Sequence, residues 1–147
     1  MRQVLAIILA LFIVLCAGCA SSPGSGSARI HVTNLRCEYL SEPLGIDVAQ
    51  PRLSWMLQSR RRGQMQTAYQ VMVAGTLEAL RDETADLWDS GKIESDQSIH
   101  VAYEGEPLQS RMKCFWKVRV WNTADEASAW SKPASWEMGL LGKNDWQ

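Results

Sequence analysis

The chain has 147 residues, with 15 lysines and arginines against 16 aspartates and glutamates, which gives a formal net charge of −1. This near-neutral balance gives no electrostatic reason to expect nucleic acid or an anionic membrane surface as a partner. After a leader and a tether are set aside, roughly 120 residues remain, which is the size of one ordinary domain.

The first 18 residues have the pattern of an export signal. Arg2 supplies a positive charge, and residues 4–17 form a continuous apolar stretch. That stretch suits the apolar region of a signal peptide and is shorter than the ~20 residues that span a bilayer. It ends in LCAGC (15–19), which resembles the bacterial lipobox, although the leucine lies one place early, and predicts a lipid on Cys19. The alternative is a plain signal peptide with two incidental cysteines.

Residues 19–28 are rich in glycine, serine and proline and predict a flexible tether. Removal of residues 1–18 would take away Arg2, leaving 14 basic against 16 acidic residues and a net charge of −2. Ala20 and Ser21 lack the aspartate associated with retention in the inner membrane. We therefore expect an exported, membrane-anchored lipoprotein of the outer membrane or facing the periplasm.

Residues 29–142 are expected to form one domain made of short strands. Alternating apolar and polar residues predict strands at 29–35, 52–58, 67–75, 98–103, 114–121 and 134–138, with a short strand and turn at 87–93. Residues 45–48 lie between two prolines and predict an irregular crossing segment. The runs 52–58 and 67–75, joined by a loop that contains Gly63, predict a β-hairpin.

The strand pattern predicts an all-β fold of the β-sandwich type. Only residues 77–86 favour a helix, and that segment is too short to organise the fold. A parallel α/β sheet would need crossover helices, for which the chain has neither the room nor the pattern.

Two cysteines fall inside the predicted domain, Cys37 and Cys114. An oxidising compartment permits a disulfide between them, but sequence spacing does not establish the geometry that a disulfide needs. Two separately buried thiols are an equally good interpretation.

Seven tryptophans suggest a carbohydrate-binding surface, because indole rings stack on the apolar faces of sugars. Three of them alternate within predicted strands and are expected in the core; these are Trp55, Trp116 and Trp136. Three others lie near strand ends or on the opposite face and are candidate carbohydrate contacts; these are Trp88, Trp121 and Trp130. The same alternation assigns Phe115, Lys117, Arg119 and Trp121 to the face opposite the core.

Catalytic and metal sites find little support in the pattern of acids and histidines. Glu94 with Asp96, and Glu104 with Glu106, have i, i+2 spacing, but turn carboxylates offer neither the fixed separation nor the burial that a glycosidase uses. His31 and His100 have no ligand at metal-binding spacing. The sequence therefore predicts no catalytic residue, no metal and no cofactor.

Several blocks of sequence, taken in order, resemble the opening of bacterial α-L-rhamnosidases. They are LRCEYL (35–40), PLGID (43–47), PRLSW (51–55), QTAYQ (66–70), LWDSGK (87–92), WKVRVW (116–121) and GLL (139–141). The resemblance covers most of residues 30–146. In that family this region is an N-terminal fibronectin type III-like sandwich, of the immunoglobulin-like architecture.

The resemblance implies a non-catalytic module that precedes a rhamnosidase catalytic domain in the same polypeptide. In the family, acidic residues of a helical domain far downstream hydrolyse terminal α-L-rhamnose, and no position here matches them. Residues 143–147 resemble the start of the linker to that missing region, so the chain is interpreted as a fragment. Rhamnose-containing glycans are a further expected partner. The alternatives are a free-standing carbohydrate-binding lipoprotein and a pure interaction domain.

Overall fold

The computed structural model of the chain describes residues 30–142 and residue 145. The predicted signal peptide (1–18), the tether (19–28) and Cys19 lie outside the described residues, as do most of residues 143–147. Of the predicted domain, residues 29–142, all but residue 29 are described.

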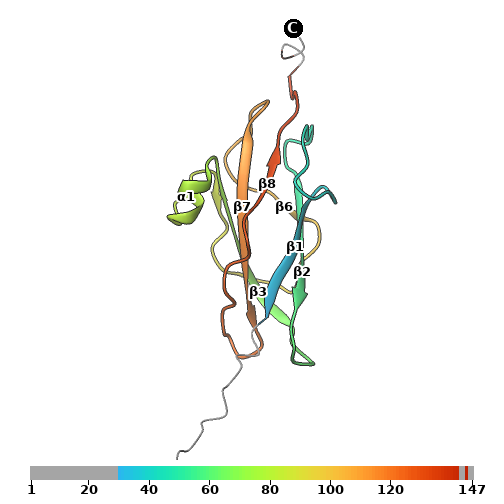
Figure 1. The fold of residues 1–147 in the computed structure, drawn as a ribbon, viewed down its shortest axis with the longest axis vertical. Coiled ribbons are helices and arrows are strands. Elements are labelled where there is room, and N and C mark those ends of the chain that lie inside the picture. The colour runs from blue at the N-terminus through green and yellow to red at the C-terminus, as the bar shows by residue number, and fades with distance from the viewer. Residues whose placement is uncertain (1–29, 143–144, 146–147) are drawn as a thin grey trace, which may run out of the picture.

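Two antiparallel sheets face each other (Figure 1). One sheet has the order β1-β2-β6, with β1 at His31–Cys37, β2 at Arg52–Gln58 and β6 at Val101–Ala102. The other has the order β4-β3-β7-β8, with β4 at Trp88–Asp89, β3 at Gln66–Ala74, β7 at Lys113–Asn122 and β8 at Ala134–Glu137. A further short strand, β5 at Ile93–Glu94, pairs with β3. The all-β prediction is confirmed as an immunoglobulin-like sandwich.

The core lies between the sheets and follows the alternation of the sequence. In β3 the side chains of Tyr69, Val71 and Val73 join the main buried cluster, and in β7 those of Val118 and Val120 do the same. Trp55, Trp116 and Trp136 are each at most 2% exposed, so their prediction as core residues is confirmed. Burial of three indoles supplies much of the hydrophobic stabilisation that a domain of this size needs.

The predicted hairpin of residues 52–58 and 67–75 is wrong. Both segments are strands, but β2 pairs with β1 and β6, whereas β3 pairs with β7 over eight residue positions. The loop of residues 59–65, with Gly63 at φ +72°, passes from one sheet to the other. Facing sheets lie only about 10 Å apart, so a loop of this length crosses between them as easily as it would close a hairpin.

The helical segment is shorter than predicted. Helix α1 covers Leu77–Arg81, and the Thr76 hydroxyl caps it by accepting from the backbone N–H of Ala79 at 3.1 Å. The buried side chain of Leu80 packs against Met72 and Ala74, so the helix lies on the outer face of the β3–β7 sheet. Within the described residues no helix is long and apolar enough to cross a membrane.

The two ends of the described domain lie at opposite ends of the sandwich. Strand β1 begins at one end, and the chain that follows β8 leaves at the other, at the end marked C in Figure 1. Ile46 forms an isolated parallel bridge with Met138 at this second end, within the segment predicted to cross irregularly. The domain therefore holds whatever precedes it and whatever follows it apart along its long axis.

Candidate functional site

The three candidate carbohydrate contacts are half-buried and do not form one site. Trp88 pairs with Val73 and Trp121 with Ala68, which places them five residues apart along β3. The ring of Trp88 packs edge-on against the core residue Tyr103, at 5.4 Å between ring centres. Trp121 and Trp130, in contrast, come together on the outer face of the β3–β7 sheet.

Arg119 brings Trp121 and Trp130 together. Its guanidinium carbon lies 5.0 Å from the ring centre of Trp121 and 4.6 Å from that of Trp130. The ammonium of Lys117 lies 4.7 Å from the Trp130 ring, and Lys117 is only 6% exposed. Cation–π contacts of this kind contribute about 0.5–1 kcal/mol each at exposed sites and more when desolvated. Trp130 thus covers the polar face of β7 and holds its cations in place.

Hydrogen bonds to Gln70 of β3 and to Glu83 hold this cluster of cations and indoles in place. Gln70, 7% exposed, accepts from the Arg119 side chain at 2.9 Å and donates to the Asp89 carboxylate at 2.7 Å. The Trp130 N–H donates to the Glu83 carboxylate at 3.1 Å, which ties the segment before β8 to the loop after α1. The cluster is therefore built into the fold rather than placed on its surface.

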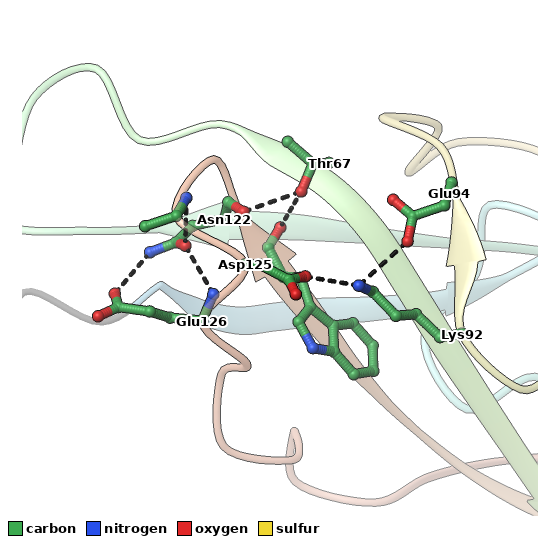
Figure 2. A network of polar contacts seen from close by, with 8 residues as sticks. Thr67, Lys92, Glu94, Asn122, Asp125 and Glu126 are labelled. Atoms are coloured by element: carbon green, nitrogen blue, oxygen red, sulfur yellow. Dashed lines mark hydrogen bonds and ion pairs between the residues drawn. The ribbon is translucent and has the colours of Figure 1, made fainter.

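A second cation over Trp121 comes from the network shown in Figure 2. The Lys92 ammonium lies 5.3 Å from the Trp121 ring centre and forms ion pairs with Asp125 and Glu94. Its hydrogen bonds to Asp125 and then Glu94 raise the pKa of Lys92 above its usual range. The Asn122 side chain closes the neighbouring turn by accepting from two backbone N–H groups and donating to the Glu126 carboxylate.

These cations bear directly on carbohydrate binding. A pyranose that stacks on Trp121 or Trp130 would need ring faces over which Lys92, Lys117 and Arg119 now lie. Trp130 also lines a groove of about 590 Å³ between β1 and residues 129–134. In this conformation the two indoles stabilise the sheet face, and a sugar would have to displace their cations.

Trp88 lines a separate, polar groove of about 360 Å³ between the β4 edge and β6. Tyr69, Gln97, His100 and Glu104 share its walls. Burial, and next the charge of Glu104, raise the pKa of the Tyr69 hydroxyl above its usual range. Apart from Trp88, sequence patterns did not identify this groove, because its walls come from strands that pair in different sheets.

The paired carboxylates do not have the environment of a glycosidase acid. Glu94, Asp96, Glu104 and Glu106 are all exposed, and the Glu94 carboxylate is engaged by Lys92 at 3.0 Å. A general acid in such an enzyme is kept protonated by burial. The His100 ring is hydrogen-bonded to the Tyr39 hydroxyl, and no group of three metal-binding side chains occurs within the described residues.

Cys37 and Cys114 are both buried in the core between the sheets, and the structure has them as free thiols. Burial first, then the charges of Glu38 and of Cys114, raise the pKa of Cys37 to about 12. Burial and then the charge of Asp86 raise the pKa of Cys114 to about 12. A disulfide between them stays a prediction, and the reduced thiols are protonated and unreactive at neutral pH.

The raised pKa values of the two thiols predict that the domain loses stability at alkaline pH. An unfolded chain ionises its cysteines near pH 9, whereas the folded domain keeps them protonated up to about pH 12. Between these values the folded state binds more protons, so each thiol lowers the free energy of unfolding by about 1.4 kcal/mol per pH unit. Urea titrations with a reductant should show this loss between pH 8 and pH 10.5, and a shallower one in Cys114→Ala. An unchanged free energy of unfolding across this range would contradict it.

The strand arrangement and the ordered sequence blocks match a known family. A family described as "Rha78A-like, N-terminal immunoglobulin domain" matches residues 32–142. The chain belongs to this family. As a Rha78A-like immunoglobulin domain it is 48% identical over 119 residues to an α-L-rhamnosidase of Streptomyces avermitilis, a match to 81% of this chain and 11% of that protein. An α-L-rhamnosidase of Formosa agariphila is 44% identical over 110 residues, which are 75% of this chain and 12% of that protein.

Solved structures agree with this assignment. The Rha78A-like domain superimposes on an α-L-rhamnosidase of Streptomyces avermitilis complexed with L-rhamnose with a TM-score of 0.77 and 47% identity, over 80% of this chain and 11% of that one. An α-L-rhamnosidase of Aspergillus terreus gives a TM-score of 0.65 at 26% identity, over 80% and 13% of the two chains. The resemblance seen in the sequence is confirmed. The chain spans about a tenth of the length of the curated relatives it matches.

Proposed function

We propose that this chain is the non-catalytic N-terminal module of a secreted or lipid-anchored α-L-rhamnosidase, which hydrolyses terminal α-L-rhamnose from glycosides. The observation that carries the proposal is the 48% identity to an α-L-rhamnosidase over only 11% of its length, within a family described as an N-terminal immunoglobulin domain. Hydrolysis is assigned to the downstream part of the longer polypeptide. The exposure of the four paired carboxylates supports a module without chemistry of its own.

The position of the two ends supports a role as a spacer. Because β1 begins at one end of the sandwich and the chain leaves at the other, the module would hold a catalytic domain one sandwich length away from an anchor (Figure 1). The proposed anchor is a lipid on Cys19, followed by the tether of residues 19–28. With such an anchor, the enzyme is expected at the outer membrane or facing the periplasm.

The anchor is tested by metabolic labelling with palmitate in the bacterial host. We expect label on the wild-type chain, with the chain in the membrane fraction, and neither in Cys19→Ser. Cys16→Ser is the matched control, because it changes the other cysteine of the leader and should keep the label. Equal labelling of wild type and Cys19→Ser would exclude this anchor.

The assignment of activity is tested with an aryl α-L-rhamnoside. We expect no release of the aryl group by the 147-residue chain and release by the longer product of the same locus. Activity in the short chain would overturn the proposal and direct attention to the paired acids Glu94, Asp96, Glu104 and Glu106. Specific binding of rhamnosides by a chain that has no longer product would instead favour a carbohydrate-binding lipoprotein.

A further inference from the structure

We infer that the loop of residues 38–48 is the surface on which the next domain of the same polypeptide docks. The inference rests on the proposed function, because it needs a domain that follows this module. The loop exposes four large apolar side chains, with 51% of Tyr39, 57% of Leu40, 78% of Leu44 and 42% of Val48 accessible to solvent. Single apolar residues are common on surfaces, but four within ten residues form a candidate interface.

The loop holds a defined shape. Glu38, Tyr39, Glu42 and Gly45 all have φ between 47° and 79°, the left-handed region that only glycine adopts easily. Cys37 and Leu40 exchange two backbone hydrogen bonds of 3.0 Å, and the Glu38 carboxylate pairs with Arg52 at 2.7 Å. Apolar side chains are thus presented outward by a fixed backbone, so little conformational entropy remains to be lost when a partner binds.

The loop is joined to the segment through which the chain leaves the domain. The Ile46 N–H donates to the Glu137 carbonyl at 2.9 Å, and the Gly139 N–H donates to the Ile46 carbonyl at 2.7 Å. Pro43 accepts from the Glu137 N–H at 2.9 Å. Leu44, the most exposed apolar residue of the loop, therefore lies between two residues that are hydrogen-bonded to the exit segment.

The exit segment is held on its other side as well. The Arg111 N–H donates to the Gly139 carbonyl at 3.0 Å, and the Leu141 N–H donates to the Ser110 hydroxyl at 2.8 Å. The path of the chain is therefore fixed up to Leu141. The chain therefore leaves the described domain beside the 38–48 loop, at the end marked C in Figure 1.

The position of the 38–48 loop beside the exit segment indicates that its partner is the next domain of the same polypeptide. The curated relatives are about nine times longer than the matched region, which covers 11% of one of them, and the matching family is described as N-terminal. A domain joined by a short linker has an effective concentration in the millimolar range, so it occupies a modest apolar surface that a free partner would leave empty. Interfaces between domains of one chain bury only about 600–1,500 Å².

The opposite end of the sandwich supplies a matched comparison. Met65, in the loop between β2 and β3, is 60% exposed, but it follows Arg60, Arg61 and Arg62 and has a strongly basic surrounding. Met65 is therefore an exposed apolar position in another loop, against which Leu44 can be compared.

The test compares thiol labelling at the two ends. Leu44→Cys and Met65→Cys are each made in the chain ending at residue 147 and in the longer product, both lacking the first 19 residues. Maleimide labelling of each peptide is followed by mass spectrometry. Cys37 and Cys114 are buried and serve as the unreactive internal standard.

Docking predicts that the thiol at position 44 reacts at least about tenfold more slowly in the longer product than in the short chain, with no change at position 65. Equal rates at position 44 in the two chains would overturn the inference. Protection of position 44 in the short chain that grows with concentration would assign the surface to a second copy and would also overturn it. Hydrolysis of an aryl α-L-rhamnoside by the same longer product reports on the proposed function separately, because labelling does not depend on activity.

Discussion

Replacing Gly105 with alanine is expected to lower the free energy of unfolding by about 3 kcal/mol or to prevent folding altogether. A β-carbon at this position would lie 2.3 Å from the Leu87 carbonyl oxygen, 2.5 Å from the Trp88 β-carbon and 2.6 Å from the Tyr103 hydroxyl. Two of these neighbours are backbone or next to backbone, so no rotamer change removes the overlap.

The close packing around Gly105 also holds the buried hydroxyl of Tyr103 in place. The Tyr103 hydroxyl, in a residue only 2% exposed, lies 2.8 Å from the Glu106 carbonyl and 3.2 Å from that of Leu87. Displacing it would leave a buried polar group without its partner, at a cost of about 1–3 kcal/mol.

Gly75→Ala is the matched control for Gly105→Ala. Its β-carbon would meet only the Asp86 carboxylate, at 3.4 Å, which is an ordinary contact. Thermal and urea unfolding of both variants should therefore show a loss for Gly105→Ala and a change within about 0.5 kcal/mol for Gly75→Ala. Equal stabilities would contradict the close packing of the 103–106 turn.

The strands and the core could be predicted from the sequence because side chains alternate between the two faces of a strand. Val71 and Val73 of β3, and Val118 and Val120 of β7, follow this rule and are fully buried. Alternation does not show, however, to which of the two sheets a strand belongs. Alternation in β2 and β3 is the same whether they pair with each other or with β1 and β7, so the hairpin prediction had no local signal to correct it.

The candidate site was predictable only in part, for a similar reason. Alternation correctly placed Lys117, Arg119 and Trp121 on the face opposite the core, and Trp130 was correctly expected near a strand end. That Trp130 returns to cover Lys117 depends on the path of residues 123–133, which contain no periodic pattern. The groove beside Trp88 likewise depends on contacts between segments distant in sequence. The same holds for the position of the 38–48 loop beside the exit segment.

A second large effect is expected at Gln66, a buried side chain that connects the two sheets. Gln66 is 4% exposed; its amide oxygen accepts from the Trp55 N–H at 3.0 Å, and its nitrogen donates to the Ser95 and Gln97 carbonyls at 3.1 and 2.8 Å. Trp55 belongs to β2 and Gln66 to β3, so this one amide joins strands that share no backbone ladder.

Gln66→Leu keeps the approximate volume and removes all three hydrogen bonds. It leaves the buried Trp55 N–H without its acceptor, and we expect the free energy of unfolding to fall by about 2–4 kcal/mol. Gln64→Leu, at a half-buried residue two positions earlier, is the control and should change it by less than about 0.5 kcal/mol.

A double-mutant cycle separates the hydrogen bond from the packing at Gln66. Trp55→Phe removes the N–H donor, so Gln66→Leu should cost about 1 kcal/mol less in that background than in the wild type. The remaining cost would report the carbonyls of Ser95 and Gln97, which lose their donor in either background. Strict additivity of the two substitutions would mean that the amide stabilises the loop of residues 95–97 alone and that the sheets are held together by apolar packing.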